Sequence, residues 1–161
     1  GELGAQLPKP DFADARMQID LVTDLISAGL VESCHDISDG GLAVSVAEMC
    51  LGGRGDGLIG AKLVITNAGE RELKGKKKIP TNTLRTDEKL FSETGGFVIE
   101  VSRKKVRAAI NVARKHKGLL IRLGITTQKK HLVVFDEGKE IINVRLGILR
   151  DAWLNGLRNK L

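Results

Sequence analysis

The residues best suited to chemistry lie in one short stretch, CHDISDGGL, at positions 34–42. It carries an imidazole, His35, beside two acids, Asp36 and Asp39, that are three residues apart. Hard carboxylate oxygens of this kind are the ligands that Mg²⁺ prefers. The spacing therefore makes this stretch a candidate for holding a metal ion.

The same stretch leads into an apolar segment that is predicted to be helical. Ser38 or Asp39 would cap this helix by accepting from the free N–H groups of its first turn. Gly40 and Gly41 would allow positive φ angles and a close approach of the backbone to a ligand. Because helix N-termini favour anions, a phosphate group is one expected occupant. The alternative is a capped helix with a tight glycine turn and a histidine that has ordinary hydrogen-bond partners.

A second polar cluster, FSETGG, occupies positions 91–96. Ser92 and Thr94 flank the carboxylate of Glu93 on a loop made flexible by glycine. Either these groups contact a ligand, or the segment is only a turn that begins a strand. Glu48 is the single charged residue of the apolar segment 40–51, and it would reach solvent, pair with a lysine, or serve the site.

The helices and strands that must position these residues are predicted from hydrophobic periodicity and from the glycine and proline residues that interrupt it. The chain is predicted to be one α/β (α+β) domain over residues 1–161, with helices packed on a mixed β-sheet. Residues 1–12 are expected to be an extended lead-in and residues 67–83 an exposed basic loop. The predicted helices are 14–28, 40–51, 85–93, 103–117 and 147–159. The predicted strands are 31–37, 57–66, 96–101, 119–125, 131–135 and 140–144.

Asp14 is expected to cap the first helix, and Gly29 to end it. In the last helix, the side chains expected to face inward are those of Ile148, Ala152 and Trp153.

Composition narrows the class of protein. The 161 residues are 42% hydrophobic and 29% charged, which is typical of a globular domain. Cys34 and Cys50 are too few for a disulfide framework and indicate reduced thiols in a cytoplasmic protein. No apolar run is long enough for a membrane helix, and the first residues show no secretory signal.

The net charge of +6 is unevenly distributed. Residues 103–117 hold seven lysines and arginines and no acid, and residues 74–78 form a second basic cluster. A basic patch attracts nucleic acid, but neither cluster contains an aromatic residue for stacking on bases. The favoured interpretation is an amphipathic helix with a solvated basic face, whose apolar stripe is Val106, Ala109, Ile110 and Ala113.

Three segments resemble a known family. HDISDGGLAVSVAEM at 35–49, EKLFSETGGFVIEV at 88–101 and LRDAWLNGL at 149–157 are similar to the synthetase subunit (PurL) of phosphoribosylformylglycinamidine synthase. The likeness is to the C-terminal domain of that enzyme's second half, in the AIR synthase-related superfamily. Related domains occur in AIR synthetase, selenophosphate synthetase, the hydrogenase maturation protein HypE and thiamine monophosphate kinase.

The resemblance implies part of an ATP-dependent amide ligase of purine biosynthesis. In that family, ATP activates the amide oxygen of formylglycinamide ribonucleotide, and ammonia displaces phosphate to give the amidine. Mg²⁺ accompanies ATP, and the ammonia comes from glutamine. The implied partners are the ATP-binding half of the same synthetase, a glutamine amidotransferase subunit, a small accessory subunit and the ribonucleotide substrate. The domain alone is expected to lack synthetase activity.

The resemblance also implies site residues by position. Asp36 would hold the metal, and the substrate or phosphate would be bound by His35, Ser38, Asp39, Gly40, Gly41, Ser92, Glu93 and Thr94. The loop at 94–96 departs from the family pattern, since Thr-Gly-Gly replaces further polar residues. This departure favours an alternative, a non-catalytic packing or regulatory domain of the same or a related synthetase. A basic nucleic-acid-binding module is the third possibility.

Overall fold

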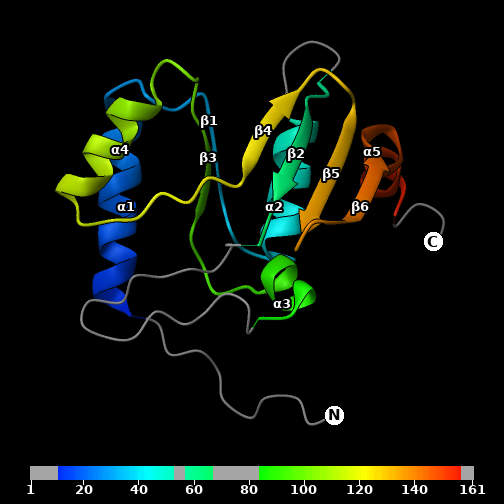
Figure 1. Cartoon of the computed structure of the whole chain (residues 1–161), viewed down its shortest axis with the longest axis horizontal. Helices are drawn as coiled ribbons and strands as arrows, with labels where there is room; N and C mark the ends of the chain where they lie inside the picture. Colours follow the sequence, from blue (N-terminus) through cyan, green and yellow to red (C-terminus); the bar gives the residue numbers. More distant parts are fainter. Residues whose placement is uncertain (1–10, 53–56, 67–83, 157–161) are drawn as a thin grey trace, which may run out of the picture.

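The computed structural model describes residues 11–52, 57–66 and 84–156 (Figure 1). The expectations for residues 1–10 of the lead-in and for the basic loop 67–83 lie outside these ranges. The helices are α1 (Phe12–Ser27), α2 (Gly41–Leu51), α3 (Thr86–Phe91), α4 (Val106–Lys115) and α5 (Leu146–Asn155). The strands are β1 (Ser33–Asp36), β2 (Gly60–Val64), β3 (Phe97–Glu100), β4 (Gly124–Thr127), β5 (His131–Asp136) and β6 (Lys139–Arg145).

The predicted α/β architecture is confirmed, and its strands are divided between two sheets. Strands β1 and β3 form an antiparallel pair, whereas the larger sheet has the order β4-β2-β5-β6. In the larger sheet only β2 and β5 run parallel, so the sheet is mixed, as expected. The β1–β3 pair stands between the larger sheet and the helices α1 and α4 (Figure 1).

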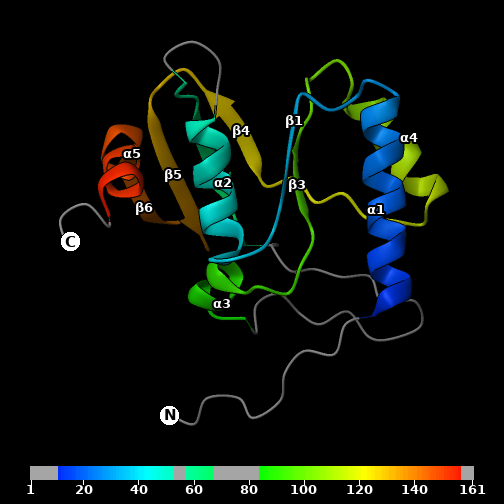
Figure 2. The same cartoon turned by 180° about the vertical axis from the view of Figure 1, so that it is seen from behind.

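Helix α2 covers one face of the larger sheet (Figure 2). Its sequence is apolar on nearly every side because it is enclosed by several elements, including β1, β2, α3 and α5. Leu42 and Val46 of α2 join Leu63, Val134 and Leu146 in the main hydrophobic core. This core fixes the start of α2, where the first polar stretch ends.

A second core lies between α1 and α4, where Leu21 and Leu25 pack against Ala109 and Ala113. Helix α1 ends as predicted: Gly29 has φ of +64°, and the N–H of Leu30 donates to the Leu25 carbonyl at 3.0 Å.

The expected cap of α1 at Asp14 is wrong. Asp11 is the N-cap, and its carboxylate accepts from the N–H groups of Ala13 and Asp14 at 3.0 and 3.1 Å. Asp14 itself lies in the first turn, where a negative charge favours the positive end of the helix dipole.

The last two helices differ from their predicted packing. In α4 only the alanines of the expected stripe are buried, because Val106 and Ile110 at its margins remain partly exposed. In α5 the inward side is formed by Leu146 and Leu149, whereas Ile148 and Trp153 are exposed. Ala152 is exposed as well, so the predicted inward face of this helix is wrong.

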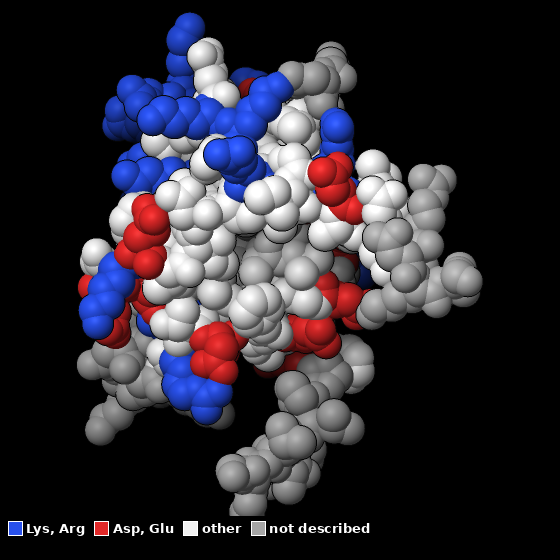
Figure 3. All heavy atoms as spheres, turned by 90° about the vertical axis from the view of Figure 1, so that its right-hand side faces the viewer, with Lys and Arg blue, Asp and Glu red and all other residues white. Residues whose placement is uncertain are grey.

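The β5–β6 hairpin forms as predicted, with Glu137 and Gly138 at positive φ in the turn. Strand β4 begins five residues later than expected, at Gly124. On the side of the molecule nearest α5, Lys and Arg gather at the top, and lower down Asp and Glu lie beside further Lys and Arg (Figure 3). Among the described residues, no helix combines the length and apolar character needed to cross a bilayer.

Candidate functional site

The two polar stretches meet in the structure. The first loop, residues 37–40, joins β1 to α2, and the second loop, residues 92–96, joins α3 to β3. Pairing of β1 with β3 places Asp36 opposite Phe97, and the N–H of Ile37 donates to the Gly96 carbonyl at 2.9 Å. The antiparallel register thus sets the loops side by side, although they are more than 50 residues apart in sequence.

A carboxylate from the second loop binds the start of α2. Oε1 of Glu93 accepts from the N–H of Gly40 at 2.8 Å. This contact replaces the expected cap, since neither Ser38 nor Asp39 provides a side-chain bond to the helix. Ser38 contributes its backbone instead, as its carbonyl accepts from the N–H of Gly41 at 2.9 Å. The negative charge of Glu93 therefore occupies a position that an anion would favour.

The glycine pair is required by local packing. Gly40 and Gly41 have φ of +78° and +64°, a region that side-chain-bearing residues rarely adopt. A Cβ on Gly41 would lie 2.8 Å from the Leu90 carbonyl oxygen and 2.9 Å from Cα of Phe91. The backbone that closely approaches this glycine thus belongs to α3, and the close contact lies within the protein.

His35 connects β1 to the middle of α2. Its Nε2 lies 2.9 Å from Oε2 of Glu48, and its Nδ1 lies 2.7 Å from the carbonyl oxygen of Asp36. Both neighbours are acceptors, so both contacts are hydrogen bonds when both ring nitrogens carry a proton. Nearby, the buried hydroxyl of Ser45 contacts the carbonyl oxygens of Asp36 and Gly41 at 2.8 and 3.0 Å. Glu48 therefore pairs with a histidine instead of the lysine considered above.

The acids proposed for metal binding face solvent. The side chain of Asp36 is 62% exposed, and Asp39 is also exposed. Within the described ranges, no three His, Cys, Asp or Glu side chains are grouped closely enough to hold a metal ion by themselves. Burial, and secondarily the charge of Asp36, raises the pKa of the Cys34 thiol above its ordinary value. Because its carboxylate is exposed, Asp36 remains available as one metal ligand among several.

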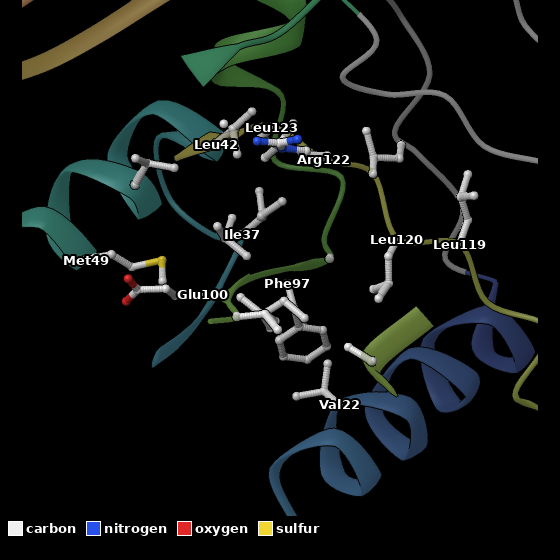
Figure 4. A pocket seen from close by; sticks show the side chains of 18 of the residues that line it. Val22, Ile37, Leu42, Met49, Phe97, Glu100, Leu119, Leu120, Arg122 and Leu123 are labelled. Carbon is white, nitrogen blue, oxygen red and sulfur yellow. The ribbon is translucent and has the colours of Figure 1, made fainter. Parts of the chain in front are cut away.

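A large cavity is lined in part by residues of the second loop (Figure 4). Its volume is about 1980 Å³, and its walls combine apolar side chains such as Phe97 with charged ones such as Arg122. Ser92 and Thr94 line it, whereas Glu93 does not.

The remaining predicted site residues do not line this cavity either; they are His35, Asp36, Ser38, Asp39, Gly40 and Gly41. The predicted residues are therefore brought together along the two loops, but they do not surround one enclosed space.

Sequence reasoning missed a buried ion pair next to the second loop. Nζ of Lys89 lies 2.9 Å from Oδ1 of Asp136, and the hydroxyl of Thr86 donates to Oδ2 at 2.7 Å. Burial alone would raise the pKa of Asp136, but the bonds from Thr86 and Lys89 lower it below its ordinary value. No local signal points to this pair, because its partners are 47 residues apart.

Comparison with known proteins shows a clear relationship. The family model "AIR synthase related protein, C-terminal domain" matches residues 2–137. The chain is 30% identical over 158 residues to phosphoribosylformylglycinamidine synthase subunit PurL of Methanothrix thermoacetophila, covering 98% of this chain and 18% of the relative. It is also 30% identical over 154 residues to the PurL subunit of Caldanaerobacter subterraneus, covering 95% and 18%. The chain thus spans less than a fifth of these relatives.

Solved structures show the same fold. The Thermotoga maritima structure described as PurL complexed with ATP has a TM-score of 0.70 and 20% identity, over 89% of this chain and 23% of that one. The structure of PurLQS from the same organism has a TM-score of 0.71 and 20% identity, over 89% and 22%. With the family model matching most of its length, the chain belongs to the AIR synthase related protein family and is a C-terminal domain of that type.

Proposed function

We propose that this chain is the C-terminal domain of a PurL-type synthetase, an ATP-dependent ligase that converts formylglycinamide ribonucleotide to its amidine. The observation that supports this most strongly is the 30% identity to PurL subunits across nearly the whole chain. The likeness to PurL structures solved with ATP and with FGAR is consistent with the same role. The reaction needs an ATP-binding half, and ammonia would come from a glutamine amidotransferase subunit, with a small accessory subunit in the complex.

Within this enzyme, the two adjoining loops would form one wall of the ligand site. Ser38, Ser92 and Thr94 offer hydroxyl groups to a phosphate or ribose, and all three are exposed. Mg²⁺ usually keeps several waters and takes one or two carboxylates together with phosphate oxygens. The exposed carboxylate of Asp36 fits that role as a single ligand, with Asp39 three residues away. When bound, Mg²⁺ would neutralise phosphate charge.

A specific observation favours a second candidate, a packing domain that supports the catalytic half. The N–H of Gly40 is already bonded to Glu93, and the space beside Gly41 is filled by α3. Some of the groups that the first loop could offer to a ligand are thus already bonded or covered within the domain. In this second role the domain would keep its fold and its contacts with the rest of the enzyme, without touching nucleotide.

The proposed activity is tested with a synthetase polypeptide that contains this domain and an ATP-binding half. With ATP, Mg²⁺, ammonium and formylglycinamide ribonucleotide, it should release one phosphate per amidine formed. The 161-residue chain alone, as the matched control, should release none. A folded synthetase that binds ATP but gives no amidine would contradict the proposed function.

The two candidate roles differ in the response to Asp36→Ala and Asp39→Ala in the same synthetase. If the loops contact ligand, both substitutions weaken Mg²⁺–nucleotide binding while the thermal midpoint stays within the error of the wild type. A packing role predicts the reverse, an unchanged affinity and at most a shift in stability. Asp20→Ala on α1, whose carboxylate binds only the exposed Arg16 among described residues, serves as a surface control.

A further inference from the structure

The ion pair between α3 and the β5–β6 hairpin is unusual because both of its charged side chains are buried. The side chain of Lys89 is 1% exposed and that of Asp136 is 4% exposed. Nζ of Lys89 contacts both carboxylate oxygens, at 2.9 and 3.1 Å, and Thr86 donates a further bond to one of them. Both charges are therefore satisfied without water, and their directions are fixed by three hydrogen bonds.

Helix α3 depends on such contacts for its position. It has only six residues, and a helix of this length has little stability of its own in water. Two of its residues, Thr86 and Lys89, are bonded to the same carboxylate of Asp136. Because these two lie three positions apart, on neighbouring points of one helix face, the bonds restrain both the rotation and the translation of α3.

The position of α3 determines where the second loop lies. The helix ends at Phe91 with Ser92 as its C-cap, and the next residue, Glu93, accepts from the N–H of Gly40 at 2.8 Å. The carbonyl of Leu90 lies against Gly41 so closely that no Cβ fits between them. A displacement of α3 by about half an ångström away from Gly40 would lengthen this 2.8 Å bond past the range of good hydrogen-bond geometry.

We propose that the Lys89–Asp136 pair is a positioning element for ligand binding, which holds α3 so that Glu93 meets the start of α2. The connection to ligand binding rests on the proposed function, whereas the positioning of the loop does not. A buried ion pair often adds no stability over apolar residues of similar volume, but its geometry is directional. Replacing both partners by apolar residues should therefore preserve the fold and loosen the loop.

The test uses the double variant Lys89→Met, Asp136→Leu in the synthetase that carries this domain. Amide hydrogen exchange is followed in the peptide containing Gly40 and, as an internal reference, in the peptide containing Ala109 of the second core. We expect exchange at Gly40 to accelerate at least tenfold while exchange at Ala109 is unchanged. In the same variant, KM for the ribonucleotide should rise several-fold, with kcat altered by less than twofold.

Lys105→Met is the matched control, since it removes an exposed pair with Glu32 and should leave both peptides unchanged. If the double variant does not fold, Thr86→Val keeps the ion pair and removes one bond, and Gly40 should then exchange about threefold faster. Unchanged exchange at Gly40, or acceleration in step with Ala109, would overturn the positioning role. Faster exchange with unchanged KM would overturn its connection to ligand binding.

A parent synthetase that lacks amidine-forming activity would contradict the proposed function alone. The exchange measurements on this domain would still decide whether the pair positions the loop.

Discussion

Substituting Gly41 by alanine tests whether the glycine pair is there for the packing of α3. Gly29 provides a matched comparison, because its φ of +64° is the same and a Cβ there meets nothing within 4 Å. Alanine in this left-handed region costs about 1–2 kcal/mol at either position. At Gly41 the new Cβ would also lie 2.8 Å from the Leu90 carbonyl oxygen, so α3 must move.

The clash adds the cost of overpacking, about 1–3 kcal/mol, to the backbone strain. We therefore expect Gly41→Ala to lower the free energy of unfolding by about 2–5 kcal/mol, and Gly29→Ala by about 1–2 kcal/mol. Urea denaturation followed by circular dichroism measures both values, provided that the m-values agree. Equal losses in the two variants would refute the claim that contact with α3 requires glycine at position 41.

Three further predictions concern other parts of the domain. The pKa of Asp136 lies below its unfolded value of about 3.9, so its ion pair with Lys89 stabilises the fold above that pH and is lost as the pH falls through the folded pKa. Asp136→Asn should therefore lower stability at pH 7 by about 3–5 kcal/mol, and by progressively less as the pH falls through the folded pKa; a loss that does not depend on pH would contradict the pairing. Burial raises the pKa of Cys50 to about 11, so iodoacetamide should modify exposed Cys34 before Cys50, with modification of Cys50 requiring unfolding. Mass spectrometry of the native protein checks this order. Trp153 is 63% exposed and is the single tryptophan, so iodide should quench its fluorescence in the native 161-residue chain; protection from quenching would show that this face of α5 is covered.

Local patterns predicted most of the elements but not their exact contacts. The apolar run of α2, with glycines on both sides, was sufficient to place that helix within one residue. The start of α1 was assigned wrongly because Asp11 and Asp14 are both suitable caps, and only the backbone conformation distinguishes them. For Trp153, periodicity showed a stripe but could not show which stripe the rest of the domain covers.

The sequence predicts the two polar loops of the candidate site, but it does not predict the contacts between them. Both polar loops were identified from residue type and spacing. Their junction through Glu93 and Gly40 joins residues 53 positions apart, and it depends on the register of β1 with β3. The cap expected at Asp39 failed for the same reason, since a distant carboxylate took its place. Such long-range contacts leave no periodic signal in a single sequence.

The most direct test of the ligand-binding role is hydrogen exchange of the two loops in the synthetase, with and without Mg²⁺–ATP and formylglycinamide ribonucleotide. If the loops form one wall of the site, peptides covering residues 37–41 and 92–96 should become protected together at saturating ligand. Asp36→Ala should reduce that protection without changing exchange in α1 or α4. Protection confined to the ATP-binding half, with both loops unaffected, would contradict a ligand-binding role for this domain.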